Sequence, residues 1–230
     1  MIALRTAGSR GYADHGWLQS WHSFSFADYY DPAEMGWGAL RVINEDVVAP
    51  GEGFPMHGHR DMEIVTVILA GALEHRDSLG NGAVLRPGEV QRMSAGLGVR
   101  HSEFNPSPEV ATHLLQIWIR PARSGATPGY EQREISLAPG ATLLASPDGR
   151  DGSVAIGQDA TLQRVRLVAD EIFVPDLAPD RFGYAHLISG VLETGDFPLS
   201  TGDGLKAHDA PGLRLTAASA ADFLWFDLPA

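Results

Sequence analysis

The amino-acid sequence predicts an all-β protein made of two β-barrels that pack face to face. The 230 residues include 26 glycines and 15 prolines without a collagen-like period. Turn signals recur about every 8–12 residues, which is the spacing of sandwiches and barrels. A motif in the first half of the chain is repeated in the second half, and the length suits two small domains or one large all-β unit.

Apolar and β-branched runs predict the strands of the first half, over residues 39–49, 63–70, 72–76 and 111–120. The stretch 121–134 is rich in proline, glycine and polar residues. We therefore expect a linker there, with a first domain over residues 1–125 and a second over 126–230.

Similar runs predict strands in the second half over residues 162–168, 184–189, 213–216 and 223–228, and residues 217–222 could form one helical turn. The segment 68–73 (ILAGAL) resembles 187–192 (LISGVL), and 87–89 (PGE) resembles 201–203 (TGD). A duplicated barrel explains both repeats. Chance similarity between two glycine-turn hairpins is the alternative.

Composition excludes several classes of protein. The chain carries 17 basic and 29 acidic residues, a net charge of −12, and has no cysteine. Phosphate backbones would repel this charge, so we expect no direct nucleic-acid binding. Disulfides, thiolate metal sites and cysteine nucleophiles are excluded. The N-terminal stretch lacks a secretory pattern and no apolar run approaches membrane length, so we expect a cytoplasmic protein that does not enter membranes.

The densest group of chemically active side chains is His57, His59 and Glu63, followed about forty residues later by His101 and Glu103. Side chains two apart on a strand share a face, so two facing strands could bring these five together. Three imidazoles and a carboxylate suit Fe(II), Mn, Ni, Cu or Zn and leave coordination positions open. Strand parity does not choose between Glu63 and Glu103 as the carboxylate.

These residues resemble the two motifs of the cupins. Gly51, His57, His59 and Glu63 match Gly-x5-His-x-His-x3-Glu, and Gly71 follows one residue later than usual. In the second motif, Gly98-x2-His101-x3-Asn105 matches, whereas Gly96 stands where proline is usual and Val90 where glycine is usual. The resemblance implies a bicupin, which is two cupin-type β-barrels in one chain.

Within the cupins, the chain is most similar to the pirins, and among these to the bacterial quercetinase-like group. The matching segments are HSFSFADYYDP (22–32), GWGALRVINED (36–46), HGHRDME (57–63), RMSAGLGVRHSEFN (92–105) and LLQIWIRP (114–121). The match is strong over residues 1–135 and looser beyond. Gly58 stands where pirins often have proline between the two histidines.

The resemblance implies a set of ligands for one divalent transition metal, which are His57, His59, His101 and Glu103. Fe(II) is the expected ion, with Mn, Ni, Cu, Zn or Co as alternatives. Glu63 is then an outer residue supporting the ligands or an alternative ligand. Glycine alignment maps His57, His59 and His101 onto Asp176, Ala178 and Leu215 of the second repeat, so we expect a degenerate, metal-free C-terminal barrel.

The resemblance also implies an activity, flavonol 2,3-dioxygenation, in which a small aromatic enol or catechol ring is opened by dioxygen. Glu103 would then be catalytic and shuttle the proton of the substrate hydroxyl. One alternative is a metal- or redox-dependent regulatory protein that binds protein partners, as eukaryotic pirins do. A cupin-type isomerase or a binding module is a third possibility.

Other histidines and aromatic residues are expected to be structural. This holds for the histidines outside the motifs, which are His15, His22, His75 and His113. The N-terminal aromatic residues could line a flavonoid pocket, but we expect them to pack that segment onto the barrel; they are Trp17, Trp21, Phe24, Phe26, Tyr29 and Tyr30. Substrate-binding residues are not predicted.

Overall fold

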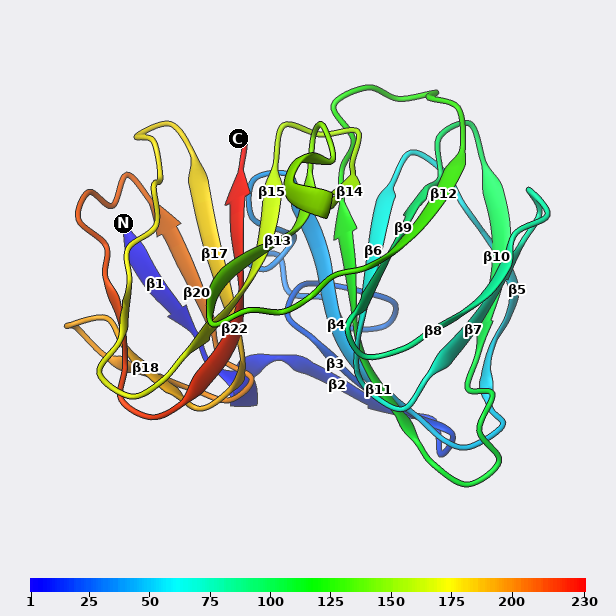
Figure 1. Ribbon diagram of the computed structural model, residues 1–230, viewed down its shortest axis with the longest axis horizontal. Helices are drawn as coiled ribbons and strands as arrows, with labels where there is room; N and C mark the ends of the chain where they lie inside the picture. Colours follow the sequence, from blue (N-terminus) through cyan, green and yellow to red (C-terminus); the bar gives the residue numbers. More distant parts are fainter.

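The computed structural model describes residues 1–230 and confirms an all-β protein of two barrels (Figure 1). Each barrel consists of a seven-stranded sheet facing a four-stranded sheet. The helical content is limited to two short 3-10 turns, η1 (Ala7–Ser9) and η2 (Arg150–Gly152). Neither turn has the length or hydrophobicity needed to cross a membrane.

The large sheet of the first barrel has the order β12-β9-β6-β11-β4-β3-β2. Its strands are β2 (Gly11–Asp14), β3 (Leu18–His22), β4 (Leu40–Val48), β6 (Glu63–Ala70), β9 (Glu89–Ser94), β11 (Thr112–Ile119) and β12 (Gly129–Glu134). The small sheet has the order β5-β10-β7-β8 and is seen at the right of Figure 1. Its strands are β5 (Gly53–His59), β7 (Leu73–Asp77), β8 (Gly82–Leu85) and β10 (Val99–Phe104).

The large sheet of the second barrel has the order β1-β20-β17-β22-β15-β13-β14. Its strands are β1 (Ile2–Arg5), β13 (Gly140–Ser146), β14 (Val154–Ala155), β15 (Thr161–Leu167), β17 (Phe182–Ser189), β20 (Gly204–His208) and β22 (Ala221–Leu228). The small sheet has the order β16-β21-β18-β19. Its strands are β16 (Ile172–Phe173), β18 (Val191–Glu193), β19 (Pro198–Ser200) and β21 (Leu215–Ala217).

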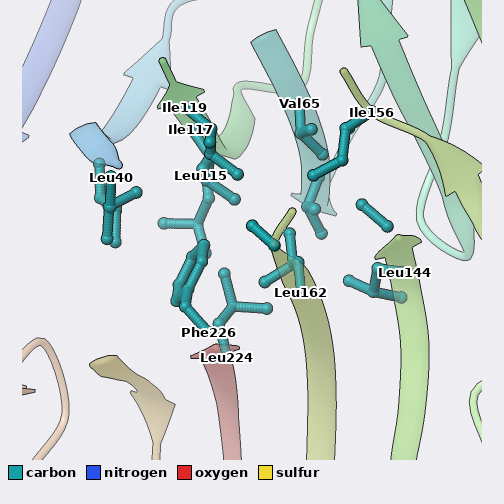
Figure 2. Close-up of a cluster of buried hydrophobic side chains, with 14 of the residues drawn as sticks. Leu40, Val65, Leu115, Ile117, Ile119, Leu144, Ile156, Leu162, Leu224 and Phe226 are labelled. Carbon is teal, nitrogen blue, oxygen red and sulfur yellow. The ribbon is translucent and has the colours of Figure 1, made fainter. Parts of the chain in front are cut away.

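The two large sheets pack face to face through one continuous apolar layer. This cluster of 21 buried residues takes side chains from both barrels. Figure 2 shows Val65, Leu115 and Ile117 of the first barrel opposite Leu162 and Phe226 of the second. Burial of apolar area at about 25 cal/mol per Å² makes such a layer the main force that joins two sheets.

The interiors of the two barrels differ in chemistry. The second barrel is filled by a cluster of 14 buried apolar residues. The first barrel holds only two small apolar clusters, of 6 and 4 residues. Its remaining interior consists of buried polar side chains, among them Asn44, Asp46, Thr66, Gln91 and Gln116. Buried polar groups cost free energy unless they are partnered, so the first barrel gives up apolar packing to build a polar site.

The repeat seen in the sequence corresponds to equivalent hairpins. Gly71 lies between β6 and β7 at φ 78°, and Gly190 lies between β17 and β18 at φ 95°. A Cβ at Gly190 would approach the carbonyl oxygen of Ala220 to 2.1 Å. Both the backbone angle and this close contact therefore require glycine.

The structure differs from the sequence prediction at three places. The expected linker contains a strand, because β12 (Gly129–Glu134) pairs with β9 of the first barrel. At the other end of the chain, β1 pairs with β20 of the second barrel. The expected helical turn over 217–222 instead ends β21 and begins β22, because pairing with neighbouring strands overrides the local helix preference of its alanines.

Candidate metal centre and cavity

Three predicted histidines meet inside the first barrel. His57 and His59 alternate with Gly58 along β5, and His101 lies directly opposite His57 on β10. Their ligand nitrogen atoms all lie within 4.8 Å of one another. The Nε2 atoms of His59 and His101 are 2.9 Å apart. This arrangement is the one that strand parity predicts.

Close packing of β5 against β10 sets this spacing. A Cβ at Gly53, where β5 begins, would lie 2.2 Å from the carbonyl oxygen of Glu103. Only glycine therefore lets the two strands approach there. Nδ1 of His57 donates a hydrogen bond of 2.8 Å to the carbonyl oxygen of Pro55. That contact leaves Nε2 as the ring nitrogen of His57 that can bind a metal ion.

The environment keeps two of these imidazoles neutral. Burial lowers the pKa of His59 to about 4, and the neighbouring His101 and His57 add to the effect. Burial together with His57 and His75 lowers the pKa of His101 to about 3. A neutral imidazole offers a lone pair to a metal ion, so at pH 7 both rings have the protonation state of a ligand.

Glu103 is buried beside His101 and has one free oxygen atom. Its Oε2 accepts a hydrogen bond of 2.8 Å from Nε2 of Gln116. Its Oε1 is buried with no hydrogen-bond partner and lies 3.9 Å from Nδ1 of His101. The ligand atoms of Glu103, His101 and His75 form a second group within 4.8 Å, which shares His101 with the group of three histidines. An unpartnered buried carboxylate oxygen is costly, and a bound cation would satisfy it.

Glu63 does not belong to the site, which corrects the prediction that it supports or replaces a ligand. Its Oε2 accepts a hydrogen bond of 2.7 Å from the Ser94 hydroxyl. Its Oε1 packs against Gly157, which follows β14 of the second barrel, and a Cβ added to Gly157 would lie only 3.0 Å from this oxygen. Glu63 shares the face of β6 with Val65, which packs between the barrels. Strand parity fails because β5 ends at His59, and the chain turns through Asp61 at φ 48° before entering the other sheet.

The second barrel replaces the polar cluster with apolar side chains. Leu215 of β21 pairs with Phe173 of β16, as His101 pairs with His57. Likewise, Ala217 pairs with Leu192, as Glu103 pairs with His75. The counterpart of His101 is thus Leu215, as predicted, whereas that of His57 is Phe173 and not Asp176. A loop-length difference between the repeats shifts the sequence alignment by three residues.

A cavity of about 740 Å³ opens beside the histidines. Its aromatic lining includes Trp17, Phe26, Tyr29, Phe54 and Trp118. The Trp118 ring meets the His59 ring edge-on with centroids 4.9 Å apart. Flat apolar walls of this kind favour an aromatic ligand.

Three of the six N-terminal aromatic residues line this cavity, which the sequence analysis did not expect. They are Trp17, Phe26 and Tyr29. Phe24 instead packs in the layer between the barrels, Trp21 packs on Tyr12, and Tyr30 is exposed. The segment therefore performs both roles that the sequence left open.

A polar row forms another part of the cavity wall. Nδ1 of His22 donates a hydrogen bond of 2.8 Å to Oδ1 of Asn44. The Ser20 hydroxyl donates to Asp46, and burial raises the pKa of Asp46 to about 7. The four residues lie on paired positions of β3 and β4. Sequence reasoning missed them, although the alternation of polar residues at 20, 22, 44 and 46 was a usable signal.

The remaining histidines divide between the site and the surface. His15 and His22 line the cavity, and His75 contacts His101 inside the barrel. His113 lies on the other side of the large sheet, where its Nε2 is 3.0 Å from Oε1 of Glu45. That these four histidines are structural or surface residues and not metal ligands stays a prediction, and three of them lie at the cavity or against His101.

Comparison with known proteins relates the whole chain to one family. Residues 3–119 match the family model described as Pirin, and residues 143–228 match the one described as Quercetinase C-terminal cupin domain. A quercetin 2,3-dioxygenase of Escherichia coli K12 is 49% identical over 229 residues, covering 100% of this chain and 99% of that protein. A pirin-like protein of Caulobacter vibrioides is 41% identical over 231 residues, covering 99% of both.

Solved structures agree with this relationship. The crystal structure of the bacterial pirin YhhW from Escherichia coli in complex with nickel(II) superposes with a TM-score of 0.96 at 49% identity. The match covers 100% of this chain and 99% of that one. The two-barrel fold, the two family matches and identity along the full length lead to one conclusion: this chain belongs to the pirin family.

Proposed function

We propose that this protein is a metal-dependent dioxygenase of the quercetinase type, which opens the ring of a flavonol or a similar aromatic enol with dioxygen. The observation that carries the proposal is a cluster of three histidines whose ligand nitrogens converge beside an aromatic cavity. Relatives named quercetin 2,3-dioxygenase support it, at 49% identity over the full length. The relative with bound nickel(II) supports a divalent metal.

His57, His59, His101 and Glu103 are the proposed ligands of one divalent ion. The three histidines converge within 4.8 Å, and Glu103, whose Oε1 has no hydrogen-bond partner, belongs to a second group that shares His101. Fe(II) suits this nitrogen and oxygen set, as do Mn, Ni, Cu, Zn and Co. The apolar filling of the second barrel supports a single ion per chain. Bound there, the ion would supply Lewis acidity and open coordination positions for substrate and dioxygen.

The side chains around the cavity prepare the substrate. The rings of Trp118 and Phe26 meet edge-on with centroids 5.3 Å apart, and with His59 they make a rigid apolar wall for a flat ligand. Gln116 fixes one oxygen of Glu103 by a hydrogen bond of 2.8 Å, which leaves the other oxygen available. In this proposal the Glu103 carboxylate also accepts the hydroxyl proton of the enol, and loss of that proton makes the substrate electron-rich enough to react.

The test is oxygen consumption with quercetin by protein loaded in turn with Fe(II), Mn(II), Ni(II), Cu(II), Co(II) and Zn(II). Turnover with release of carbon monoxide is expected with at least one ion, and loss of turnover in the His57→Ala, His59→Ala double variant. His208→Ala is the control, because His208 stacks on Phe182 in the second barrel. No oxygen uptake with any ion, or full turnover by the double variant, contradicts the proposal.

A further inference from the structure

His101 makes contacts on both sides of its ring. Its Nε2 faces His59 at 2.9 Å, and its Nδ1 lies 3.4 Å from Nδ1 of His75. On the far side of His75, Nε2 lies 3.1 Å from Oδ2 of Asp77. A continuous line therefore runs from Asp77 through His75 to His101 and ends at the histidine cluster. The line connects β7 to its neighbour β10, where Glu103 pairs with His75 and His101 with Asp77.

The direction of the hydrogen bonds along this line follows from Asp77. Burial alone would raise the pKa of Asp77, but hydrogen bonds from Asn81 and His75 outweigh it and hold the pKa below its ordinary value. An ionised carboxylate only accepts, so Nε2 of His75 must donate to it. With Nε2–H of His75 directed to Asp77, Nδ1 is the ring nitrogen left to accept, so the 3.4 Å contact assigns the donor role to Nδ1 of His101. Nε2 of His101 is left unprotonated, and it faces the cluster.

We propose that His75 and Asp77 are positioning residues that hold His101 in the orientation and tautomer required of a metal ligand. The inference rests on the proposed metal site and extends it to two residues that do not touch the ion. Histidine ligands commonly donate their second nitrogen to a partner that fixes the ring. Here that partner is a second histidine, which is fixed in turn by a carboxylate.

Two further observations support this assignment. The side chains of His75 and Asp77 are completely buried, so solvent does not compete for their hydrogen bond. The Tyr130 ring stacks on His75 with centroids 4.7 Å apart and an interplanar angle of 25°, which holds the imidazole in place. In the second barrel, where Leu215 stands in for His101, the neighbouring strand β18 (Val191–Glu193) contains no histidine. The barrel without the ligand histidine has thus also lost its partner.

The first test measures Co(II) affinity by titration of the visible absorption bands. In Asp77→Asn, the amide oxygen can still accept from the backbone N–H groups of Leu79 and Asn81, as Oδ1 of Asp77 does. The amide nitrogen then donates to His75, which reverses the hydrogen bonds and protonates His101 at Nε2. His75→Phe keeps a ring against Tyr130 and removes both nitrogens. Each variant should bind Co(II) about 10- to 100-fold more weakly with shifted absorption bands.

The matched controls are Glu45→Gln and His113→Phe, which break a histidine–carboxylate pair of this barrel that does not contact the cluster. That pair joins atoms 3.0 Å apart outside the cavity, so its loss should leave Co(II) affinity within twofold of wild type. Unfolding temperatures of the metal-free variants establish that each one folds. Wild-type affinity in both Asp77→Asn and His75→Phe would overturn the inference. A wild-type protein that binds no divalent ion would instead overturn the proposed function.

The second test needs no substitution. Nitrogen-15 chemical shifts of the metal-free wild-type protein report the tautomer of each histidine. The expected result is a proton on Nδ1 of His101 and on Nε2 of His75. A proton on Nε2 of His101 would contradict the inference whether or not the variants fold.

Discussion

The substitution Glu103→Gln tests two effects of the Glu103 carboxylate separately, which are its contribution to metal affinity and its effect on the free energy of unfolding. The carboxylate is buried, one oxygen accepts from Gln116, and the other has no partner. No Lys or Arg lies in ion-pair contact with it. Removing an uncompensated buried charge should stabilise the metal-free protein by about 1–3 kcal/mol, since glutamine can still bond to Gln116. At roughly 2–4 °C per kcal/mol for a chain of this size, the unfolding temperature rises by a few degrees.

The same substitution should weaken metal binding. Two unit charges 4 Å apart attract by about 4 kcal/mol at an effective dielectric constant of 20, and a divalent ion doubles this. The cost of desolvating both charges cancels much of this attraction. Even a net loss of about 1.4 kcal/mol in binding free energy nevertheless raises Kd tenfold. Turnover of a flavonol should fall by about 10²–10⁴, the usual contribution of a positioned base. We therefore expect Glu103→Gln to raise the stability of the metal-free protein and to lower its affinity for the metal ion.

Glu63→Gln is the matched control, because Glu63 is also a buried carboxylate with one side-chain donor, Ser94. It faces away from the cluster, so metal affinity should stay within twofold of wild type. Thermal unfolding of metal-free protein and isothermal titration with Co(II) give both quantities. Unchanged affinity in Glu103→Gln, or a larger loss in Glu63→Gln, would refute the placement of the carboxylate ligand.

Three further predictions concern stoichiometry, pH and the cavity. Metal analysis should find one ion per chain, and none in the His57→Ala, His59→Ala double variant; a second ion would show that the C-terminal barrel also binds. The folded-state pKa values of His59 and His101 are about 4 and 3, below the ordinary 6.5. As pH falls, the two imidazoles are protonated in the unfolded protein before they are protonated in the folded protein. The free energy of unfolding of the metal-free protein therefore decreases below about pH 6.5. The decrease is about 1.4 kcal/mol per pH unit for each residue, until the pH reaches the folded-state pKa of that residue. Denaturant unfolding from pH 8 to 4.5 measures this, and a flat profile contradicts it. His22→Phe removes an acceptor nitrogen from the cavity but keeps a ring beside Phe26, which lies 5.3 Å away. It should raise KM for hydroxylated flavonols about tenfold, the value of one lost hydrogen bond, and leave Co(II) affinity unchanged; an equal KM for all substrates would show that His22 does not contact them.

Some of the expectations drawn from the sequence stay predictions. Cytoplasmic location, the choice of Fe(II) among the divalent ions, and the regulatory alternative with a protein partner belong to this group. Capture of one defined partner by the metal-loaded protein and not by the metal-free protein would favour the regulatory role. Oxygen uptake with an enol substrate would favour the enzyme.

The sequence by itself determined the features that repeat within one strand or one turn. Period-two alternation placed His57 with His59 and His101 with Glu103, because side chains two apart share a face of any strand. Glycines that adopt positive φ marked the equivalent hairpins at Gly71 and Gly190. Both signals are local, so they survive without knowledge of the rest of the chain.

Only the tertiary structure decided what lies across a turn or between sheets. Alternation stops at His59, and the turn through Asp61 sends Glu63 to the face between the barrels. The partner of His101 is His75, 26 residues earlier in the chain, and strand pairing brings them together. The same pairing puts Phe173, and not Asp176, in the place of His57. The alternation of one strand does not predict the next strand beyond a turn. The sheet, register and face of each strand depend on the apolar area that it buries and on the hydrogen bonds that it forms with its neighbours.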